Sequence, residues 1–207
     1  EDNARDYDLF GIRYVAAPPT QKPQPFWKLL KEGKTWKLYE IQKVGYVTTG
    51  VRPAVVATDK RSYVNAVRLW IQTDQTHAKG LYPELTFAKD YPRNTGLPNF
   101  KMLDEVTYVV PDGSTHNLFA EPPVYMVTGD MKQETGMKIV EETNDSDMVF
   151  KANVEVPEGC RECIVILKQS FHPNWRATID GKAAQTMTVF PFYLAVQVPL
   201  GTHEIIF

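Results

Sequence analysis

Long apolar runs, excess basic charge and phosphate-binding motifs are all missing from this chain. No apolar run approaches the ~20 residues that span a bilayer. The net charge is −2 at pH 7, which argues against a strongly basic surface for nucleic acid. The sequence also contains no glycine-rich phosphate loop and no RNA-binding motif. We therefore expect neither a nucleic-acid partner nor a cofactor.

Cysteine is scarce, because the only two are Cys160 and Cys163 in the segment GCREC. A C-x-x-C pair can be a disulfide, a redox centre or half of a metal site. Redox pairs usually lie at a helix N-terminus, whereas this pair lies in a predicted turn before a strand. A zinc site needs two further ligands, and the four histidines are scattered. The sequence favours a small disulfide across the turn or two unpaired structural thiols, and it predicts no metal.

Aromatic and proline residues are plentiful by contrast. Aromatic residues make up 12% of the 207 residues, and there are 15 prolines. Aromatic residues favour strands, and proline favours the turns between them. Short apolar segments divided by turn residues are typical of a β-sandwich. We expect an α+β, mainly β fold: an antiparallel, jelly-roll-like β-sandwich with a small N-terminal α/β lobe.

Three regions are predicted along the chain. Residues 1–73 form the small α/β lobe, residues 74–105 form a polar, turn-rich connection, and residues 106–207 form the sandwich. The lobe ends in an amphipathic helix over residues 61–73, because apolar residues recur there at three- and four-residue spacing. These apolar residues are Tyr63, Ala66, Val67, Trp70 and Ile71.

The stretch from Cys163 to Phe207 contains the clearest structural signal. The apolar run that begins at Ile164 predicts a buried strand, and further apolar runs follow it. Asp180 and Gly181 separate two of these segments. Because Asp-Gly suits a type I′ turn, in which both central residues have positive φ, the pair predicts a β-hairpin.

The segment His172-Pro173-Asn174-Trp175 is the candidate for chemistry or binding. His172 with Asp180 would provide a general base, and Trp175 with His172 and Asn174 would provide a platform on which a sugar stacks. Hydrolytic catalysis, however, needs two placed carboxylates or a nucleophile with an oriented base. We favour a rigid, proline-fixed corner with Trp175 packed on the sandwich, and we predict no catalytic residue. His172, Asn174 and Trp175 stay as candidate glycan contacts.

Aromatic and acidic residues elsewhere are interpreted in structural terms. The aromatic residues of the lobe are either core residues or a glycan-binding surface, and burial is the favoured interpretation. The set comprises Tyr7, Tyr14, Trp27, Trp36, Tyr39, Tyr63 and Trp70. Acidic pairs such as Glu141 and Glu142 lack the alternating oxygen ligands of a calcium loop, so a solvated surface is expected.

Two C-terminal segments carry a resemblance to a known family. The segment Ser170–Lys182 resembles the S-x-x-P-x-W-x-A-x-V-D-G-K segment near the end of YfhO-like multi-pass bacterial membrane proteins. The segment Val198–Phe207 resembles the V-P-x-G-x-H-x-V-x-F strand of the same family. Near the N-terminus, Asp8–Val15 resembles the family segment L-L-G-V-K-Y-V, and Trp36–Glu40 resembles a family strand. The middle of the chain matches no family segment, and the pair Cys160 and Cys163 is not part of the family pattern.

The resemblance implies an extracytoplasmic region of a membrane-anchored parent protein. YfhO-like proteins are similar to membrane glycosyltransferases that use lipid-linked sugars, and their catalytic acids lie in loops between membrane helices. None of those acids falls within these 207 residues. We therefore expect a non-catalytic domain at the outer face of the cell membrane that assists acceptor or glycan recognition. Its partners would be the rest of the parent chain and a glycan or lipid-linked sugar.

Other interpretations compete with this expectation. The main alternative is a carbohydrate-binding β-sandwich module of a secreted or surface protein, which the aromatic residues favour. A free-standing hydrolase that uses His172 or Asp180 ranks lowest. The chain also ends inside a predicted strand at Phe207, and from this we expect a piece of a longer protein.

Overall fold

The structure is a computed structural model in which the chain divides into two compact units, Glu1–Tyr46 and Val47–Phe207. It describes residues 4–41, 45–52, 55–58, 64, 67, 70–71, 80–87, 101–102, 107–109, 115–117, 136–146, 148–160 and 162–207.

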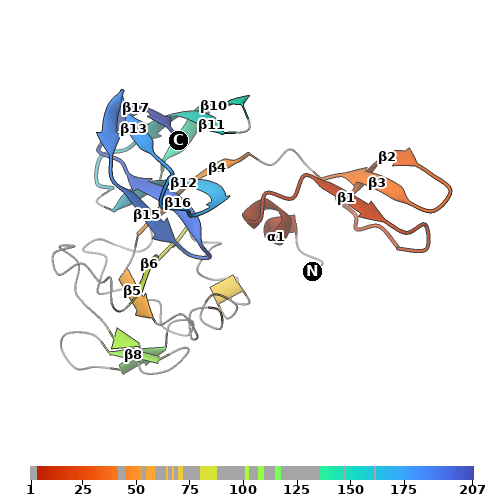
Figure 1. The fold of residues 1–207 in the computed structure, drawn as a ribbon, viewed down its shortest axis with the longest axis horizontal. Helices are drawn as coiled ribbons and strands as arrows, with labels where there is room; N and C mark the ends of the chain where they lie inside the picture. The colour runs from red at the N-terminus through yellow and green to blue at the C-terminus, as the bar shows by residue number, and fades with distance from the viewer. Residues whose placement is uncertain are drawn as a thin grey trace. The chain divides into compact units, whose positions relative to one another are not determined.

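The first unit is a short helix followed by a three-stranded antiparallel sheet (Figure 1). Helix α1 (Ala4–Leu9) ends where Gly11 takes a φ of 63°, a left-handed conformation that suits glycine after a helix. The strands are β1 (Tyr14–Ala17), β2 (Lys28–Glu32) and β3 (Lys37–Glu40), and β3 lies between the other two.

One face of this small sheet is covered by aromatic side chains. Tyr39 of β3 is only 4% exposed, and its ring centroid lies 5.3 Å from that of Trp27. Tyr7 of α1 makes edge contacts with the rings of Trp27 and Phe26. These residues fit the structural interpretation of the lobe aromatics. Trp36 and Tyr14 do not, since they are 39% and 52% exposed.

The second unit contains two sheets (Figure 1). The five-stranded sheet has the order β10-β11-β17-β13-β14 and is antiparallel. Its strands are β10 (Lys138–Ser146), β11 (Val149–Val156), β13 (Ala177–Ile179), β14 (Lys182–Ala184) and β17 (Gly201–Ile206).

The nine-stranded sheet has the order β4-β12-β16-β15-β6-β5-β7-β8-β9. Most of its pairs are antiparallel, but β5 runs parallel to both β6 and β7. Its strands are β4 (Val47–Val51), β5 (Val55–Thr58), β6 (Glu84–Phe87), β7 (Lys101–Met102), β8 (Thr107–Val109), β9 (Thr115–Asn117), β12 (Cys163–Ser170), β15 (Thr186–Val189) and β16 (Tyr193–Gln197).

Burial along the strands follows from their sequences. β12 is buried without interruption from Cys163 to Lys168, as expected for an apolar run with both faces covered. β11 alternates between buried and less buried residues, as expected for a strand with one face in the core. The fully buried side chains include Ile164, Ile166, Leu194 and Val196 from the larger sheet and Val154 and Ile205 from the smaller one. The predicted mainly β, sandwich-like fold is confirmed.

The region of the predicted amphipathic helix is described at four positions. Val64, Val67, Trp70 and Ile71 are all helical. Val64 is 53% exposed, whereas Val67 and Trp70 are buried, so the apolar spacing identifies the buried side. The Trp70 ring packs against the rings of Tyr82 and Phe190, which belong to the second unit.

The division into units falls after residue 46, whereas the sequence analysis places a boundary after residue 73. Strand β4 pairs with β12 over five residue pairs, which ties Val47–Val51 to the second unit. Most of the predicted connection at residues 74–105 lies outside the described residues, but β6 and β7 fall within it. Within the described part of the chain, no helix is both long enough and apolar enough to cross a membrane.

Candidate functional site

A groove of about 580 Å³ lies in the second unit. Ligand sites commonly enclose about 300–1,000 Å³. The wall is formed by the β13–β14 hairpin, by β15 and by residues near the end of β16. The lining residues are Arg52, Glu84, Ile179, Asp180, Lys182, Ala183, Ala184, Gln185, Met187, Gln197 and Pro199.

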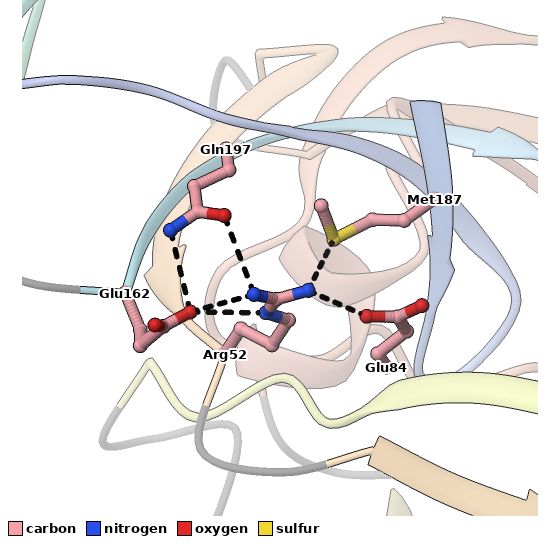
Figure 2. A network of polar contacts seen from close by, with 5 residues as sticks. All are labelled: Arg52, Glu84, Glu162, Met187 and Gln197. Atoms are coloured by element: carbon pink, nitrogen blue, oxygen red, sulfur yellow. Dashed lines mark hydrogen bonds and ion pairs between the residues drawn. The ribbon is translucent and has the colours of Figure 1, made fainter. Parts of the chain in front are cut away.

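Arg52 is a buried cation of the groove, and only 7% of the residue is exposed. Its Nη1 lies 2.7 Å from Glu84 Oε2, and its Nη2 lies 2.8 Å from Glu162 Oε2. Its Nε also donates to Glu162 Oε2 at 3.1 Å. Figure 2 shows the guanidinium between the two carboxylates. The arginine therefore links Glu84, the first residue of β6, to Glu162, which directly precedes β12.

Two neutral side chains complete the coordination of Arg52 (Figure 2). Nη2 donates to Gln197 Oε1 at 3.3 Å, and Nη1 lies 4.0 Å from Met187 Sδ. Gln197 in turn donates from Nε2 to Glu162 Oε2 at 3.4 Å. Because each guanidinium nitrogen has a partner, the orientation of Arg52 is fixed. Since the Gln197 amide bonds at both ends, its orientation is fixed as well.

The electrostatics of Arg52 combine two opposing effects. Burial works against the charged form, but the hydrogen bonds to Glu162 and Glu84 outweigh it and raise the pKa of Arg52 above its ordinary value. A buried charge is tolerated only where it is paired and hydrogen-bonded. Glu84 and Glu162 supply both the opposite charge and the hydrogen-bond acceptors.

Close backbone packing brings Arg52 and Glu84 together. A Cβ at Gly50 would lie 2.6 Å from the Tyr82 ring and 2.9 Å from the Gly80 carbonyl oxygen, so only glycine fits there. The residue after Gly50, Val51, donates its N–H to Gly80 and accepts from Tyr82. The strand that contains Glu84 therefore begins beside the end of β4.

The hairpin wall of the groove is fixed by its turn. Asp180 has a φ of 52° and Gly181 a φ of 75°, and Ile179 pairs with Lys182 across the turn. Positive φ at both central residues is the geometry of a type I′ turn. The side chains on either side of Gly181, those of Asp180 and Lys182, both line the groove.

Asp180 also forms an ion pair with His203 of β17. His203 Nδ1 lies 2.7 Å from Asp180 Oδ2, and His203 Nε2 lies 3.1 Å from the Leu200 carbonyl oxygen. Both partners are acceptors, so the ring satisfies both contacts when both nitrogens carry a proton. The other Asp180 oxygen accepts from the Glu204 N–H at 2.9 Å. Asp180 thus holds the hairpin against β17.

These contacts shift both pKa values toward the charged pair. The hydrogen bond from His203 and the Glu204 N–H lower the pKa of the Asp180 carboxyl. The hydrogen bond to Asp180 raises the pKa of His203, with a smaller opposing effect from burial.

The corner His172–Trp175 is separate from the residues that line the groove. The Asn174 N–H donates to His172 Nδ1 at 3.2 Å, and the Trp175 N–H donates to the His172 carbonyl oxygen at 3.0 Å. The half-buried Trp175 ring lies 6.1 Å from that of Phe150, between centroids. His172 and Asn174 are exposed. Glycan contact at His172, Asn174 and Trp175 stays a prediction.

Cys160 and Cys163 are joined as a disulfide. The bridge closes the turn before β12, where Gly159 takes a φ of 90°. Glu162 lies inside this small loop, so the loop presents a carboxylate to Arg52. Among the residues that the structure describes, no cluster of His, Cys, Asp or Glu is suited to a metal ion.

Sequence reasoning assigned no role to Arg52, Glu84, Glu162 or Gln197. The Arg52 partners lie 32, 110 and 145 residues away in the sequence, so no spacing rule connects them. His203 was visible as part of the family-like strand, but its contact with Asp180 was not.

The fold and the groove define a mainly β, sandwich-like protein with a ligand-sized recess. Comparison with known proteins found no match: no family profile, no curated protein and no solved structure is significantly similar to the chain. The resemblance to YfhO-like proteins therefore stays a prediction.

Replacing Arg52 should destabilise the protein strongly. Arg52→Met leaves the partly buried carboxylates of Glu84 and Glu162 without their cation, and we expect the free energy of unfolding in urea to fall by about 3 kcal/mol. Arg176→Met is the matched control, because exposed Arg176 donates to the backbone carbonyl oxygens of Pro173 and Trp175 and forms no ion pair with a described residue. Arg176→Met should lower the free energy of unfolding by less than about 1 kcal/mol. Equal losses would show that the Arg52 network contributes no special stability.

The contribution of the Asp180–His203 pair should depend on pH. Because folding raises the pKa of His203, protonated His203 stabilises the fold fully below the ordinary pKa of 6.5. This stabilisation is lost as pH rises through the folded-state pKa of His203. Because folding lowers the pKa of Asp180, its carboxylate stabilises the fold fully above the ordinary pKa of 3.8. This stabilisation is lost as pH falls through the folded-state pKa of Asp180. The stability advantage of wild type over His203→Asn should therefore be greatest between about pH 4 and pH 6.5 and should shrink above this window.

The measurement is urea unfolding of both proteins across this pH range. In an Asp180→Asn background, His203→Asn should have an effect that varies little with pH, since the carboxylate partner is gone. An advantage of the same size from about pH 5 to about pH 9 in the wild-type background would refute the ion pair.

Proposed function

We propose that this chain is a non-catalytic, extracytoplasmic domain of an integral membrane protein similar to glycosyltransferases, and that it assists recognition of an acceptor or glycan. The observation that carries the proposal is the contact between Asp180 and His203. These residues belong to the two family-like segments Ser170–Lys182 and Val198–Phe207. Their contact fixes the hairpin whose Asp180 and Lys182 line the groove.

The chemistry of the groove supports a saccharide ligand. Arg52 and Glu84 neutralise each other, and Asp180 is paired with His203, so the lining offers oriented polar groups with little net charge. Hydroxyl groups both donate and accept hydrogen bonds, which suits a lining of carboxylate, amide and amine groups. The apolar lining residues Ile179, Ala183, Ala184, Met187 and Pro199 would contact the apolar faces of a sugar ring.

Saccharide binding should depend on the groove. We expect calorimetric titration with oligosaccharides and with soluble analogues of lipid-linked sugars to show binding to the wild-type chain. Lys182→Ala and Gln185→Ala each remove an exposed polar side chain of the groove, and each should weaken binding about tenfold, the cost of a lost hydrogen bond. Lys138→Ala, an exposed lysine of β10, is the matched control and should bind as the wild type does.

The corner variant Trp175→Ala separates the two candidate surfaces. Loss of binding in Trp175→Ala, with normal binding in the groove variants, would move the contact to His172, Asn174 and Trp175. Absence of binding to every saccharide by the wild-type chain would contradict the recognition role.

The main alternative is a carbohydrate-binding sandwich of a secreted or surface protein, favoured by the half-buried Trp175 at an exposed corner. The parent gene distinguishes the two. Our proposal predicts ten or more apolar segments of about 20 residues upstream and another shortly after Phe207. A signal peptide without such segments would exclude it and leave the secreted module.

A further inference from the structure

Strand β2 of the first unit exposes apolar side chains. All five of its residues are exposed, and Leu29 and Leu30 are 48% and 46% exposed. The register with β3 passes from Leu29 opposite Tyr39 to Lys31 opposite Leu38, so Leu30 is an unpaired bulge residue. β2 and β3 form a hairpin (Figure 1) whose outer strand leaves two leucines in contact with solvent.

Trp36 adds an exposed aromatic ring at the end of this hairpin. It is 39% exposed, and its backbone carbonyl accepts from the Gly33 N–H at 2.8 Å. A Cβ at Gly33 would lie only 2.8 Å from the indole ring, so the ring lies against the glycine backbone of the turn. Leu29, Leu30 and Trp36 therefore place apolar surface on one short hairpin.

The same hairpin carries concentrated positive charge. The residues from Lys28 to Lys37 include four lysines and one acid, Glu32. Glu32 pairs with Lys37 at 3.0 Å. A second acid, Glu40, ends β3 opposite Lys28, so the four lysines and two glutamates of the hairpin leave a net charge of +2. Because the whole chain has a net charge of −2, the positive charge is local to this hairpin.

We propose that the β2–β3 hairpin binds the surface of an anionic lipid bilayer. Leu29, Leu30 and Trp36 enter the boundary between headgroups and acyl chains, where Trp is favoured, while the lysines contact anionic headgroups. The lysines favour an anionic bilayer over a second copy of the chain or another protein as the binding partner. Two copies of such a hairpin repel each other, and protein interfaces are depleted in lysine.

This proposal does not depend on saccharide recognition, because the hairpin and the groove lie in different units. Either can fail without affecting the other, since the saccharide titration contains no lipid and the lipid assay contains no saccharide.

The test is co-sedimentation of the full chain with lipid vesicles. We expect binding to vesicles of phosphatidylcholine mixed with phosphatidylglycerol and negligible binding to phosphatidylcholine alone. The affinity should fall as salt rises, because salt screens the attraction. Lys28→Gln/Lys31→Gln should lower the affinity about 30-fold, since each lysine near an anionic surface contributes roughly a fivefold factor.

Two double variants test the apolar contribution. Leu29→Ser/Leu30→Ser should weaken vesicle binding, whereas Val140→Ser/Met148→Ser should not, although Val140 and Met148 are even more exposed. Circular dichroism checks that every variant is folded. Bromine-labelled lipids should quench a component of tryptophan fluorescence that is absent in Trp36→Phe.

Several results would overturn the proposal. One is equal binding to neutral and anionic vesicles, and another is no binding to either. A third is a loss of vesicle affinity in Val140→Ser/Met148→Ser as large as the loss in Leu29→Ser/Leu30→Ser. A wild-type dimer that dissociates in Leu29→Ser/Leu30→Ser would assign the hairpin to contact between two copies of the chain instead.

Discussion

The buried charge of Arg52 is the constraint on which the second unit depends most visibly. A buried guanidinium needs hydrogen-bond acceptors in place of water. Here the acceptors come from four segments that lie in or beside the nine-stranded sheet. Glu84 begins β6, Glu162 precedes β12, Met187 belongs to β15, and Gln197 ends β16. If one of these strands shifted, a buried charge would lose a partner, so the network helps to set the arrangement of the strands.

The Asp180–His203 pair has the same function at the groove wall. Asp180 takes part in the turn, accepts from the Glu204 backbone and bonds to His203. A residue that looked like a candidate general base in the sequence is fully engaged in fixing the hairpin. The hairpin therefore presents Lys182 to the groove beside the Asp180 carboxylate, whose charge His203 neutralises. Under our proposal, this hairpin serves recognition of a ligand and takes no part in proton transfer.

The two units use their aromatic residues in different ways. In the first unit, Trp27 and Tyr39 cover one side of a small sheet, while Trp36 stays exposed on a basic hairpin. In the second unit, Trp70 is completely buried against Tyr82 and Phe190. Aromatic content alone could not separate core from surface, because the same ring serves either purpose according to what packs on it.

The sequence by itself determined the local features: the buried strand at Ile164–Leu167, the Asp180–Gly181 turn and the helical spacing of Val67 and Trp70. Each depends on apolar spacing or backbone preferences within a few residues, and such preferences act without knowledge of the rest of the chain. Only the tertiary structure decided which charges meet. Arg52 finds its partners up to 145 residues away, and His203 finds Asp180 across 23 residues. Pairing over such separations depends on how strands cross and on what they bury, so the groove could not be read from the sequence.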